Sequence, residues 1–364
     1  MVFFKEGFMQ RIGIAGIGNI SGIYLENLTG MFGRQVKVTA AADVVFDRAE
    51  KAAANFGLKA FESAAEMAGS GDIDIVLNIT PPKIHYSVAL AVINAGKHVY
   101  NEKPICSKRE EAAHLIKAAA EKGVRVGGAP DTFLGAGLQT CRKIIDDGWI
   151  GTPVAATAVM MKRGPEHWHP DPEFFYKDGG GPMFDMGPYY ITALVNLLGP
   201  VARVSGSAKI ITPTRTITNK HQYGAIINVE VPTHIAGVLD FACGAVGTIV
   251  TSFDVYSHTL PFIEIYGTEG TLKVPDPNTF GGPVIVRRFS DEEWYKIPLL
   301  KNYSDNSRGL GITEMAEAIE EGRQHRASAE LAFHVLDIMH SIHDASASGK
   351  HIKLKSKCKK PAAL

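Results

Sequence analysis

The first half of the chain alternates short apolar runs with helical stretches, and this alternation is the feature that most constrains the fold. The runs typical of buried strands are Ile12–Ala15, Val36–Ala42, Ile73–Ile79, His98–Asn101 and Val124–Gly127. Helical stretches between them end at Gly96 and Gly123, and glycine is the residue best suited to a helix C-terminus. Strands that alternate with helices form parallel sheets. The pattern therefore predicts a parallel α/β domain over residues 9–129.

After Pro130 the pattern changes to longer strands that are rich in β-branched and aromatic residues. These are Ile226–Val231, His234–Phe241, Val246–Phe253, Phe262–Tyr266 and Val284–Phe289, with an earlier strand at Val154–Met161. Gly and Pro separate most of them, as in a largely antiparallel sheet. We therefore predict an α+β domain over residues 130–350, followed by a basic tail, 351–364, that is disordered or loosely held.

Length and composition limit the classes of partner. A chain of 364 residues exceeds what one hydrophobic core usually supports, so two domains are expected. The 38 basic and 38 acidic residues balance, so no net charge attracts nucleic acid or an anionic membrane. The four cysteines are far apart, which indicates neither a zinc site nor a disulfide framework and favours a reducing cytoplasm. No segment is typical of a signal peptide or a membrane span, and residues 1–8 are interpreted as an upstream extension.

A glycine-rich turn follows the first strand pattern. Gly16 and Gly18 stand where the strand would turn into a helix, so that the backbone can approach a pyrophosphate group. Asn19 and Ile20 would open that helix beside the same group. Ser21 occupies the position where the dinucleotide fingerprint has Gly or Ala, but it is small enough for close packing. The turn alone is a weak signal, and a plain tight turn is the alternative.

Asp43 strengthens the prediction of a dinucleotide site. It ends the second strand pattern, where a carboxylate can accept hydrogen bonds from both ribose hydroxyls of NAD. The same carboxylate would repel the 2′-phosphate of NADP, and the first arginine beyond it is Arg48. We therefore expect NAD to be the preferred cofactor, with NADP as the alternative. The other interpretation is that Asp43 only caps a loop.

Three further motifs resemble the Gfo/Idh/MocA family of oxidoreductases. They are Thr80-Pro81-Pro82 followed by His85, then Glu102-Lys103-Pro104, then the glycine-rich segment Gly179–Gly187. The resemblance extends from about Arg11 to Lys350. It implies a Rossmann domain followed by a domain with a large open sheet, with the substrate held between the sheet face and the nicotinamide. It also implies that the cofactor contacts include Thr80, Pro81, His85 and Glu102.

The resemblance assigns the catalytic role to Lys103, which follows a strand at its C-terminal end, where ligands of such sheets bind. An ammonium beside a cationic nicotinamide should have a lowered pKa, so that it exchanges a proton with a substrate hydroxyl near neutral pH. Glu102 would orient Lys103 or contact the cofactor, and Pro104 is a candidate for a cis peptide bond. The alternative is that Lys103 is an ordinary solvated loop lysine.

A second catalytic pair is implied for the other half of the chain. Many family members have an aspartate and, four residues later, a histidine, whereas this chain has Asp185 and Tyr189. Because proline is tolerated in the first helical turn, Pro188 predicts a helix that begins near Met186 with Asp185 at its N-terminus. A phenol titrates at a pH of about 10, so Tyr189 would serve as an acid or hydrogen-bond donor. Packing in the core is the alternative for Tyr189.

Other polar residues are candidates for substrate binding. A polar and aromatic cluster, typical of sugar sites, precedes the glycine-rich segment and comprises Glu166, His167, Trp168, His169 and Asp171. Two histidines without a third ligand at a recognisable spacing do not predict a metal site. Near the end of the chain, Arg308 resembles a family position close to the substrate, and a surface ion pair is its alternative role.

Together these features predict reversible hydride transfer between NAD(P) and an alcohol or ketone of a sugar, glycoside or cyclitol. Two other classes stay open. Some family members oxidise a sugar transiently and act as lyases or glycosidases without net redox change, and a regulator binds the dinucleotide without catalysis. Net NADH formation separates the first class from a dehydrogenase, and the presence of Lys103 and Asp185 argues against the second. The family also implies a homo-oligomer, a dimer or tetramer, formed through the sheet face.

Overall fold

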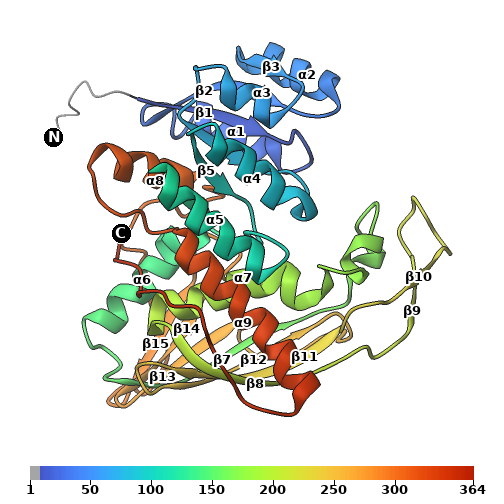
Figure 1. Cartoon of the computed structure of the whole chain (residues 1–364). Coiled ribbons are helices and arrows are strands. Elements are labelled where there is room, and N and C mark those ends of the chain that lie inside the picture. Colours follow the sequence, from blue (N-terminus) through green and yellow to red (C-terminus); the bar gives the residue numbers. More distant parts are fainter. Residues whose placement is uncertain (1–8) are drawn as a thin grey trace. The chain divides into compact units, whose positions relative to one another are not determined.

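The computed structural model describes residues 9–364 (Figure 1), and the predicted upstream extension, residues 1–8, lies outside the described residues. Contacts divide the chain into two units. The first comprises the residues up to Asp131 together with Asn306–Phe333, and the second comprises Thr132–Asp305 together with His334–Leu364. The first unit thus contains a C-terminal segment that the sequence alone placed with the second domain.

A parallel sheet of six strands forms the centre of the first unit, in the order β3-β2-β1-β4-β5-β6. The strands are β1 (Gln10–Ala15), β2 (Val36–Ala42), β3 (Lys59–Phe61), β4 (Ile75–Asn78), β5 (His98–Asn101) and β6 (Val126–Gly128). The strand order reverses between β1 and β4, and ligands of such sheets bind at the carboxyl ends of the strands at this switch. The predicted Rossmann-type domain is confirmed.

Helices connect these strands by the crossovers that parallel pairing requires. They are α1 (Ser21–Thr29), α2 (Phe46–Phe56), α3 (Ala64–Gly69), α4 (His85–Asn94) and α5 (Arg109–Lys122), and α8 (Leu310–Glu320) completes the unit beside β6. A short 3₁₀ turn, Pro82–Ile84, precedes α4. Gly96 and Gly123 adopt φ angles of +73° and +68° where α4 and α5 end, as predicted.

A mixed sheet of nine strands dominates the second unit, in the order β16-β15-β14-β13-β7-β12-β11-β8-β17. Its strands are β7 (Pro153–Met161), β8 (Val201–Lys209), β11 (His234–Phe241), β12 (Val246–Ser252), β13 (Ile263–Gly267), β14 (Gly270–Val274), β15 (Val284–Arg288), β16 (Tyr295–Ile297) and β17 (Ile352–Lys353). Only β7 and β12 pair in parallel, so the predicted, mostly antiparallel sheet is confirmed. A separate hairpin pairs β9 (Thr214–Thr216) with β10 (Ile226–Asn228).

Three helices cover one face of the large sheet (Figure 1): α6 (Ala136–Asp146), α7 (Gly181–Leu198) and α9 (Ala329–Ser348). Two glycines allow α9 to approach closely. A Cβ atom on Gly206 of β8 would lie 2.6 Å from a side-chain carbon of Ile342, and one on Gly237 of β11 would lie 3.1 Å from another. Larger residues at these two positions would push the helix away from the sheet.

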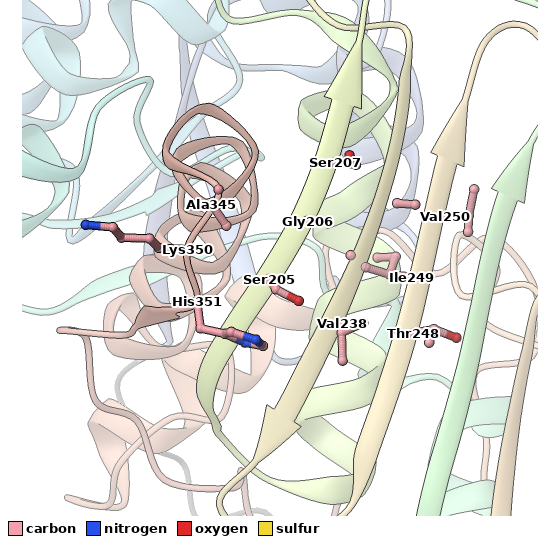
Figure 2. A pocket seen from close by; sticks show the side chains of 13 residues that line it. Ser205, Gly206, Ser207, Val238, Thr248, Ile249, Val250, Ala345, Lys350 and His351 are labelled. Carbon is pink, nitrogen blue, oxygen red and sulfur yellow. The ribbon is translucent and has the colours of Figure 1, made fainter.

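The opposite face of the central strands is exposed and carries small and β-branched side chains (Figure 2). Val238 lies at the centre, with Ser205 and Thr248 as its register partners on the neighbouring strands. Together with Ser207 and Val250 these residues line a shallow groove, which Ala345 of α9 and the segment at Lys350 and His351 also border. A sheet face of this composition resembles an interface more than a solvated surface.

The C-terminal tail, residues 351–364, is not loosely held, so that prediction is wrong. β17 pairs with β8, and beyond it the backbone N–H of Ser356 donates to Asp337 Oδ2 (3.0 Å). The backbone N–H of Val201 donates to His334 Nε2, which leaves Nδ1 of His334 to donate to Ser356 Oγ (2.8 Å). Burial lowers the pKa of His334 to about 4, which keeps the ring neutral in this arrangement. The basic composition of the tail indicated a solvated segment. In the structure, however, backbone groups of the tail form hydrogen bonds with side chains of the helices.

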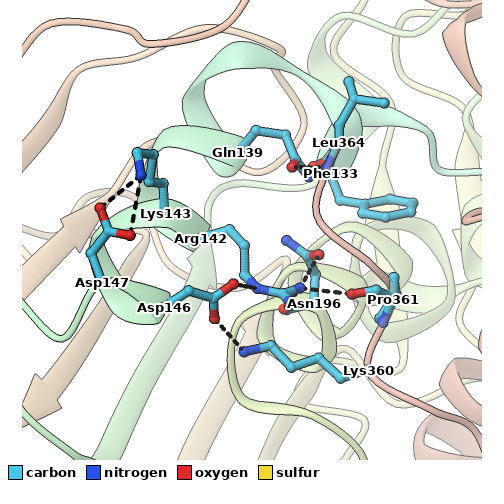
Figure 3. A network of polar contacts seen from close by, with 10 residues as sticks. All are labelled: Phe133, Gln139, Arg142, Lys143, Asp146, Asp147, Asn196, Lys360, Pro361 and Leu364. Carbon is cyan, nitrogen blue, oxygen red and sulfur yellow. Dashed lines mark hydrogen bonds and ion pairs between the residues drawn. The ribbon is translucent and has the colours of Figure 1, made fainter.

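Arg142 of α6 holds the last residues of the tail (Figure 3). Its buried guanidinium donates to the backbone oxygens of Asn196 (3.0 Å) and Pro361 (2.8 Å) and to Asp146 Oδ2 (2.6 Å). Lys360 pairs with the other oxygen of Asp146 at 3.1 Å. The cation thus ties two helices and the tail together, and its bonds to the two backbone oxygens are buried.

We expect Arg142→Met to lower the free energy of unfolding by about 3 kcal/mol, because two buried backbone oxygens would lose their charged donor. The matched control is Lys143→Met on the same helix. Lys143 forms an exposed pair with Asp147 (2.8 Å), which is worth about 0.5 kcal/mol or less. Urea unfolding of both variants measures the difference, and equal losses would contradict a stabilising role for Arg142.

Candidate active site

The glycine turn lies at the carboxyl end of β1, next to the loop after β4. Gly16 has a φ of +95°, and a Cβ atom there would lie 2.8 Å from the backbone nitrogen of Thr80, so only glycine fits. At Gly18, by contrast, a Cβ would meet nothing within 4 Å, which leaves its backbone open to a ligand. Ile20 stands at the N-cap of α1 and has no side chain that accepts a hydrogen bond. Although the N–H of Ser21 donates to the backbone oxygen of Gly18 (3.1 Å), a helix end without a side-chain cap suits a pyrophosphate.

Asp43 holds this turn to the end of β2. Its Oδ2 accepts the backbone N–H of Ile17 (2.7 Å), and its Oδ1 accepts that of Val45 (2.8 Å). Each carboxylate oxygen can accept a second hydrogen bond, so capping the loop and binding a ribose are compatible. The residues therefore fit a dinucleotide: an open backbone at Gly18, an uncapped helix N-terminus and an acceptor at the end of β2.

A cavity of about 420 Å³ adjoins the turn on the side of α2. Gly18 and Asn19 line one part of it, and Arg48, Lys51 and Asn55 line another. The cavity thus combines backbone from the glycine turn with two cationic side chains. Such a lining suits an anionic group. The sequence had pointed to Arg48 only as the first arginine after Asp43.

His85 lies beneath the loop that carries Thr80 and Pro81. Its ring is buried, with Nε2 2.7 Å from the backbone oxygen of Thr80 and Nδ1 2.7 Å from that of Pro104. Burial is the largest influence and lowers its pKa, against the two carbonyl contacts, which raise it. Thr80 and Pro81 are more exposed, and Thr80 Oγ1 donates to Asn78 Oδ1 (2.6 Å). The His85 ring therefore contacts protein groups through both nitrogens.

Glu102 is buried and supports Lys103 from within the chain. The Tyr24 hydroxyl donates to Glu102 Oε1 (2.7 Å), and the backbone N–H of Lys103 donates to Oε2 (2.7 Å). Burial, followed by the charge of Glu102, raises the pKa of Tyr24 well above its usual value, so Tyr24 stays a donor. The Lys103–Pro104 peptide bond is cis, as predicted. Lys103 itself lies at the carboxyl end of β5 and is partly exposed.

Asp131 is a buried acid that sequence reasoning missed. Its Oδ2 accepts the backbone N–H groups of Gly309 and Gly311, each at 3.0 Å, at the N-terminus of α8. Burial raises its pKa to about 6, although the bond from Gly311 and the charge of Arg308 act in the opposite direction. Arg308 lies in the same segment, where its Nη1 donates to Asn306 Oδ1 (2.7 Å). Arg308 thus belongs to the unit with the parallel sheet.

Asp185 and Tyr189 lie on α7 of the second unit, and the predicted start of this helix near Met186 is wrong. The helix begins at Gly181, so that Pro182 occupies the first turn and Pro188 lies inside. An interior proline costs about 3 kcal/mol, but burial of every residue from 186 to 198 offsets that cost. Asp185 is partly exposed and Tyr189 is buried, one turn apart on the same helical side.

The candidate substrate loop is held by the hairpin β9–β10. Glu166 is buried, receives a hydrogen bond from the Tyr176 hydroxyl and lies 3.6 Å from Nη1 of Arg215. Its backbone oxygen accepts the N–H groups of Thr218 (2.9 Å) and Asn219 (3.1 Å). Glu166 is therefore an anchor of the loop rather than an exposed ligand.

The neighbours of Glu166 differ in exposure. His169 Nδ1 accepts the backbone N–H of Asp171 (3.1 Å), and its ring packs edge-on against Trp168 (5.3 Å between centroids) and Phe175 (5.2 Å). His167 Nδ1 lies 2.7 Å from the backbone oxygen of Gly164, and His167 and Trp168 are both exposed. Across residues 9–364, no group of three or more His, Cys, Asp or Glu side chains is placed to hold a metal ion.

Besides Asp131, sequence reasoning missed Asn78 and Asn101, which are fully buried at the last positions of β4 and β5. The available signal is a polar residue in the last two positions of an otherwise apolar strand pattern, shortly before a motif. Apolar periodicity does not reveal the role of such residues, because it predicts the strand but not the hydrogen-bond partner of a polar side chain within it.

Comparison with protein families matches both parts of the chain. Residues 10–129 match the model of an oxidoreductase family with an NAD-binding Rossmann fold. Residues 138–273 match the model of the GFO/IDH/MocA C-terminal domain. Both matches fall on the segments that the sequence motifs had indicated.

Known relatives agree with these matches. Inositol 2-dehydrogenase 3 of Saccharopolyspora erythraea is 28% identical over 305 residues, which cover 78% of this chain and 79% of that protein. A Bacillus subtilis scyllo-inositol 2-dehydrogenase (NADP(+)) is 24% identical over 79% of this chain and 81% of its own. Among solved structures, a levoglucosan dehydrogenase in complex with NADH aligns with a TM-score of 0.82 and 20% identity, covering 96% of this chain and 100% of that one. The last similarity shows the fold.

Asp131→Asn should stabilise the protein at neutral pH and not in acid. The folded state raises the pKa of Asp131 from 3.8 to about 6, so the wild type loses stability as the pH rises through that range. Asparagine keeps an acceptor for both glycine N–H groups and cannot ionise. We expect its stability advantage to grow by about 2 kcal/mol between pH of about 4.5 and about 7.5 in urea unfolding.

The control for the loss of one charge is Asp47→Asn, on the exposed first turn of α2. An advantage of Asp131→Asn that stays constant across the pH range, or that appears equally in the control, would refute the assignment.

Proposed function

The chain belongs to the Gfo/Idh/MocA family of oxidoreductases, and on this basis we propose that it transfers a hydride between NAD(P) and an alcohol or ketone of a sugar, glycoside or cyclitol. One observation carries the proposal: Lys103 stands at the carboxyl end of β5 in a unit whose glycine turn fits a dinucleotide. The combination joins a cofactor site to a group that can move a proton.

Residues of the glycine turn and the neighbouring loop would hold the cofactor. Backbone N–H groups at Gly18, Asn19 and Ile20 would bind the pyrophosphate, with Gly16 allowing the turn to lie against the β4 loop. Thr80 and Pro81 would contact the dinucleotide from that loop, while His85 and Glu102 support it from buried positions. When bound, the nicotinamide accepts or donates the hydride.

NAD is the proposed preference, because the carboxylate of Asp43 suits ribose hydroxyls and repels a 2′-phosphate. Arg48 and Lys51 supply positive charge in the adjoining cavity and make NADP the alternative. One relative is named for NADP and one neighbouring structure contains NADH, so relatives of both kinds exist.

Lys103 is proposed as the group that takes the hydroxyl proton in the oxidation direction and returns it in reduction. Asp185 would balance the positive charge of the ammonium, and Tyr189 would donate a hydrogen bond to the substrate oxygen. His167, Trp168, His169 and Arg308 are proposed substrate contacts. Of these, His167 and Trp168 are exposed. The imidazole of His167 can form hydrogen bonds with sugar hydroxyls, and the indole of Trp168 can pack against the C–H face of a sugar.

The proposed compartment is the cytoplasm. Cys106 and Cys141 are buried as thiols, as in a reducing environment. Within the described part of the chain, the helices lack the length and apolar character that a membrane crossing requires.

The proposed assembly is a homo-oligomer through the exposed sheet face. Small and β-branched side chains around Val238 allow two copies of a sheet to approach closely, and a two-fold axis would place the same strands against each other.

The test of function is NADH formation over a panel of inositols, aldoses and glycosides, with NAD and NADP side by side. We expect turnover with at least one cyclitol or sugar, a higher kcat/KM with NAD than with NADP, and a loss of roughly 10²- to 10⁴-fold in kcat for Lys103→Ala. Lys108→Ala, an exposed lysine of the same loop, is the control and should retain wild-type kcat.

Binding of NADH without net turnover on any panel member would overturn the dehydrogenase proposal. Cleavage of a glycoside under the same conditions would then assign the transient-oxidation chemistry instead.

Oligomerisation is tested with Val238→Lys, which places a charge at the centre of the exposed sheet face. We expect the molar mass in light scattering to fall to that of a smaller assembly, because a buried unpaired ammonium opposes association. Met31→Lys, an exposed apolar position in the first unit, is the control. An unchanged mass for Val238→Lys would exclude this face as the interface.

A further inference from the structure

Asn78 and Asn101 form a buried amide pair at the ends of β4 and β5. The two residues are register partners on adjacent parallel strands, and both are completely buried. Strands at the centre of a parallel sheet are normally apolar, since both faces are covered. A pair of amides in this place costs free energy unless every polar group has a partner.

The two amides belong to a chain of hydrogen bonds that runs from the β4 loop to the β5 loop. At each step the donor lies on the side of the β4 loop and the acceptor on the side of the β5 loop. Thr80 Oγ1 donates to Asn78 Oδ1 (2.6 Å), Asn78 Nδ2 donates to Asn101 Oδ1 (3.0 Å), and Asn101 Nδ2 donates to the backbone oxygen of Ile105 (3.0 Å). Asn78 Nδ2 also donates to the backbone oxygen of His85 (3.1 Å). Because the last acceptors are carbonyls, the orientation of both amides is determined by their partners.

The ring of His85 forms a second link between the same loops. It lies between the backbone oxygens of Thr80 and Pro104, at 2.7 Å from each. The backbone N–H of Glu102 adds a third contact, since it donates to the backbone oxygen of Asn78 (2.8 Å). The loop after β4 and the loop after β5 are therefore joined by side chains and by backbone.

Lys103 lies inside the segment that these contacts hold. Before it, Glu102 is bound to β4 and accepts the N–H of Lys103; after it, Pro104 and Ile105 are held by His85 and Asn101. The backbone on both sides of the lysine is thus restrained by buried groups. A displacement of about 1 Å in a reacting group can lower a rate roughly 100-fold, so restraint of this kind bears directly on turnover.

We propose that Asn78 and Asn101 are positioning residues, which hold Lys103 in register with the cofactor loop that carries Thr80. The proposal rests on the proposed function, in which Lys103 moves the proton and Thr80 contacts the dinucleotide. The direction of the hydrogen bonds makes the two asparagines unequal. Asn101 donates only to the loop after β5, at Ile105. Asn78 bonds to Thr80 and His85 after β4 and also donates to Asn101 of β5.

Asn101→Asp tests this with almost no change of volume. Aspartate at this position keeps an oxygen for Asn78 Nδ2 but turns its second oxygen toward the carbonyl of Ile105. When ionised it repels that carbonyl, and when protonated it donates to it as asparagine does. We expect kcat at a pH of about 8 to fall about 100-fold, with recovery toward wild type as the pH falls, while the NADH Kd changes less than about threefold.

Asn78→Asp should behave differently. Its new oxygen would face both Asn101 Oδ1 and the His85 carbonyl, and one proton can restore only one of these bonds. We therefore expect kcat to fall and the NADH Kd to weaken about tenfold, with little recovery in acid.

The matched control is Gln139→Glu in the second unit. Gln139 is also a buried amide whose nitrogen donates to a carbonyl, that of Phe133 at 2.9 Å. The same amide-to-acid change should lower the Tm of the protein and leave kcat at the wild-type value. A loss of kcat in Asn101→Asp that matches the loss in this control, or an unchanged kcat in Asn101→Asp, would overturn the positioning role.

A readout without turnover separates this inference from the proposed function. Hydrogen exchange should speed up at residues 102–106 in Asn101→Asp and stay unchanged at the glycine turn, residues 15–21. If the wild type shows no turnover on any substrate, the proposed function fails, and exchange alone decides the positioning role. Exchange that is unchanged at 102–106 would refute it in either case.

Discussion

Hydrogen bonding at the carboxyl ends of β1, β4 and β5 is the constraint on which the candidate site depends. A parallel sheet brings these strand ends to one edge, but the loops that leave them have polar backbone groups that burial would leave unpaired. Asn78 and Asn101 bond to such groups from within the sheet, and His85 does so from the start of α4. Gly16 then lets the first loop lie against the second, since any side chain there would collide with Thr80.

Buried charge follows the same principle in both units. Asp131 caps α8 in the first unit, and Arg142 joins α6, α7 and the tail in the second. In each case one ionisable side chain forms hydrogen bonds with two backbone groups that have no partner within their own helix or loop. Such groups bring together segments that are far apart in the sequence, which explains why Asn306–Phe333 belongs with the first unit and the tail with the second.

Part of the site was predictable from the sequence because it rests on local rules. Gly16 and Gly18 mark a strand-to-helix turn, Asp43 ends a strand, and Glu102-Lys103-Pro104 follows another, so their placement at one sheet edge follows from the parallel topology. The start of α7 was not predictable, because Pro188 argues locally for a later start. Only the burial of the helix outweighs the proline, and burial is a property of the packed unit.

By itself, the sequence determined the alternation of strands and helices, the change to an antiparallel sheet, and the motifs that place Lys103 and the glycine turn at strand ends. These depend on periodicity and on residues close together in the chain. The tertiary structure alone decided that Asn78 bonds to Asn101, that Asp131 caps α8 and that the basic tail packs on Arg142. Each of these joins residues on different elements, and a polar side chain shows its partner only when folding removes the water between them.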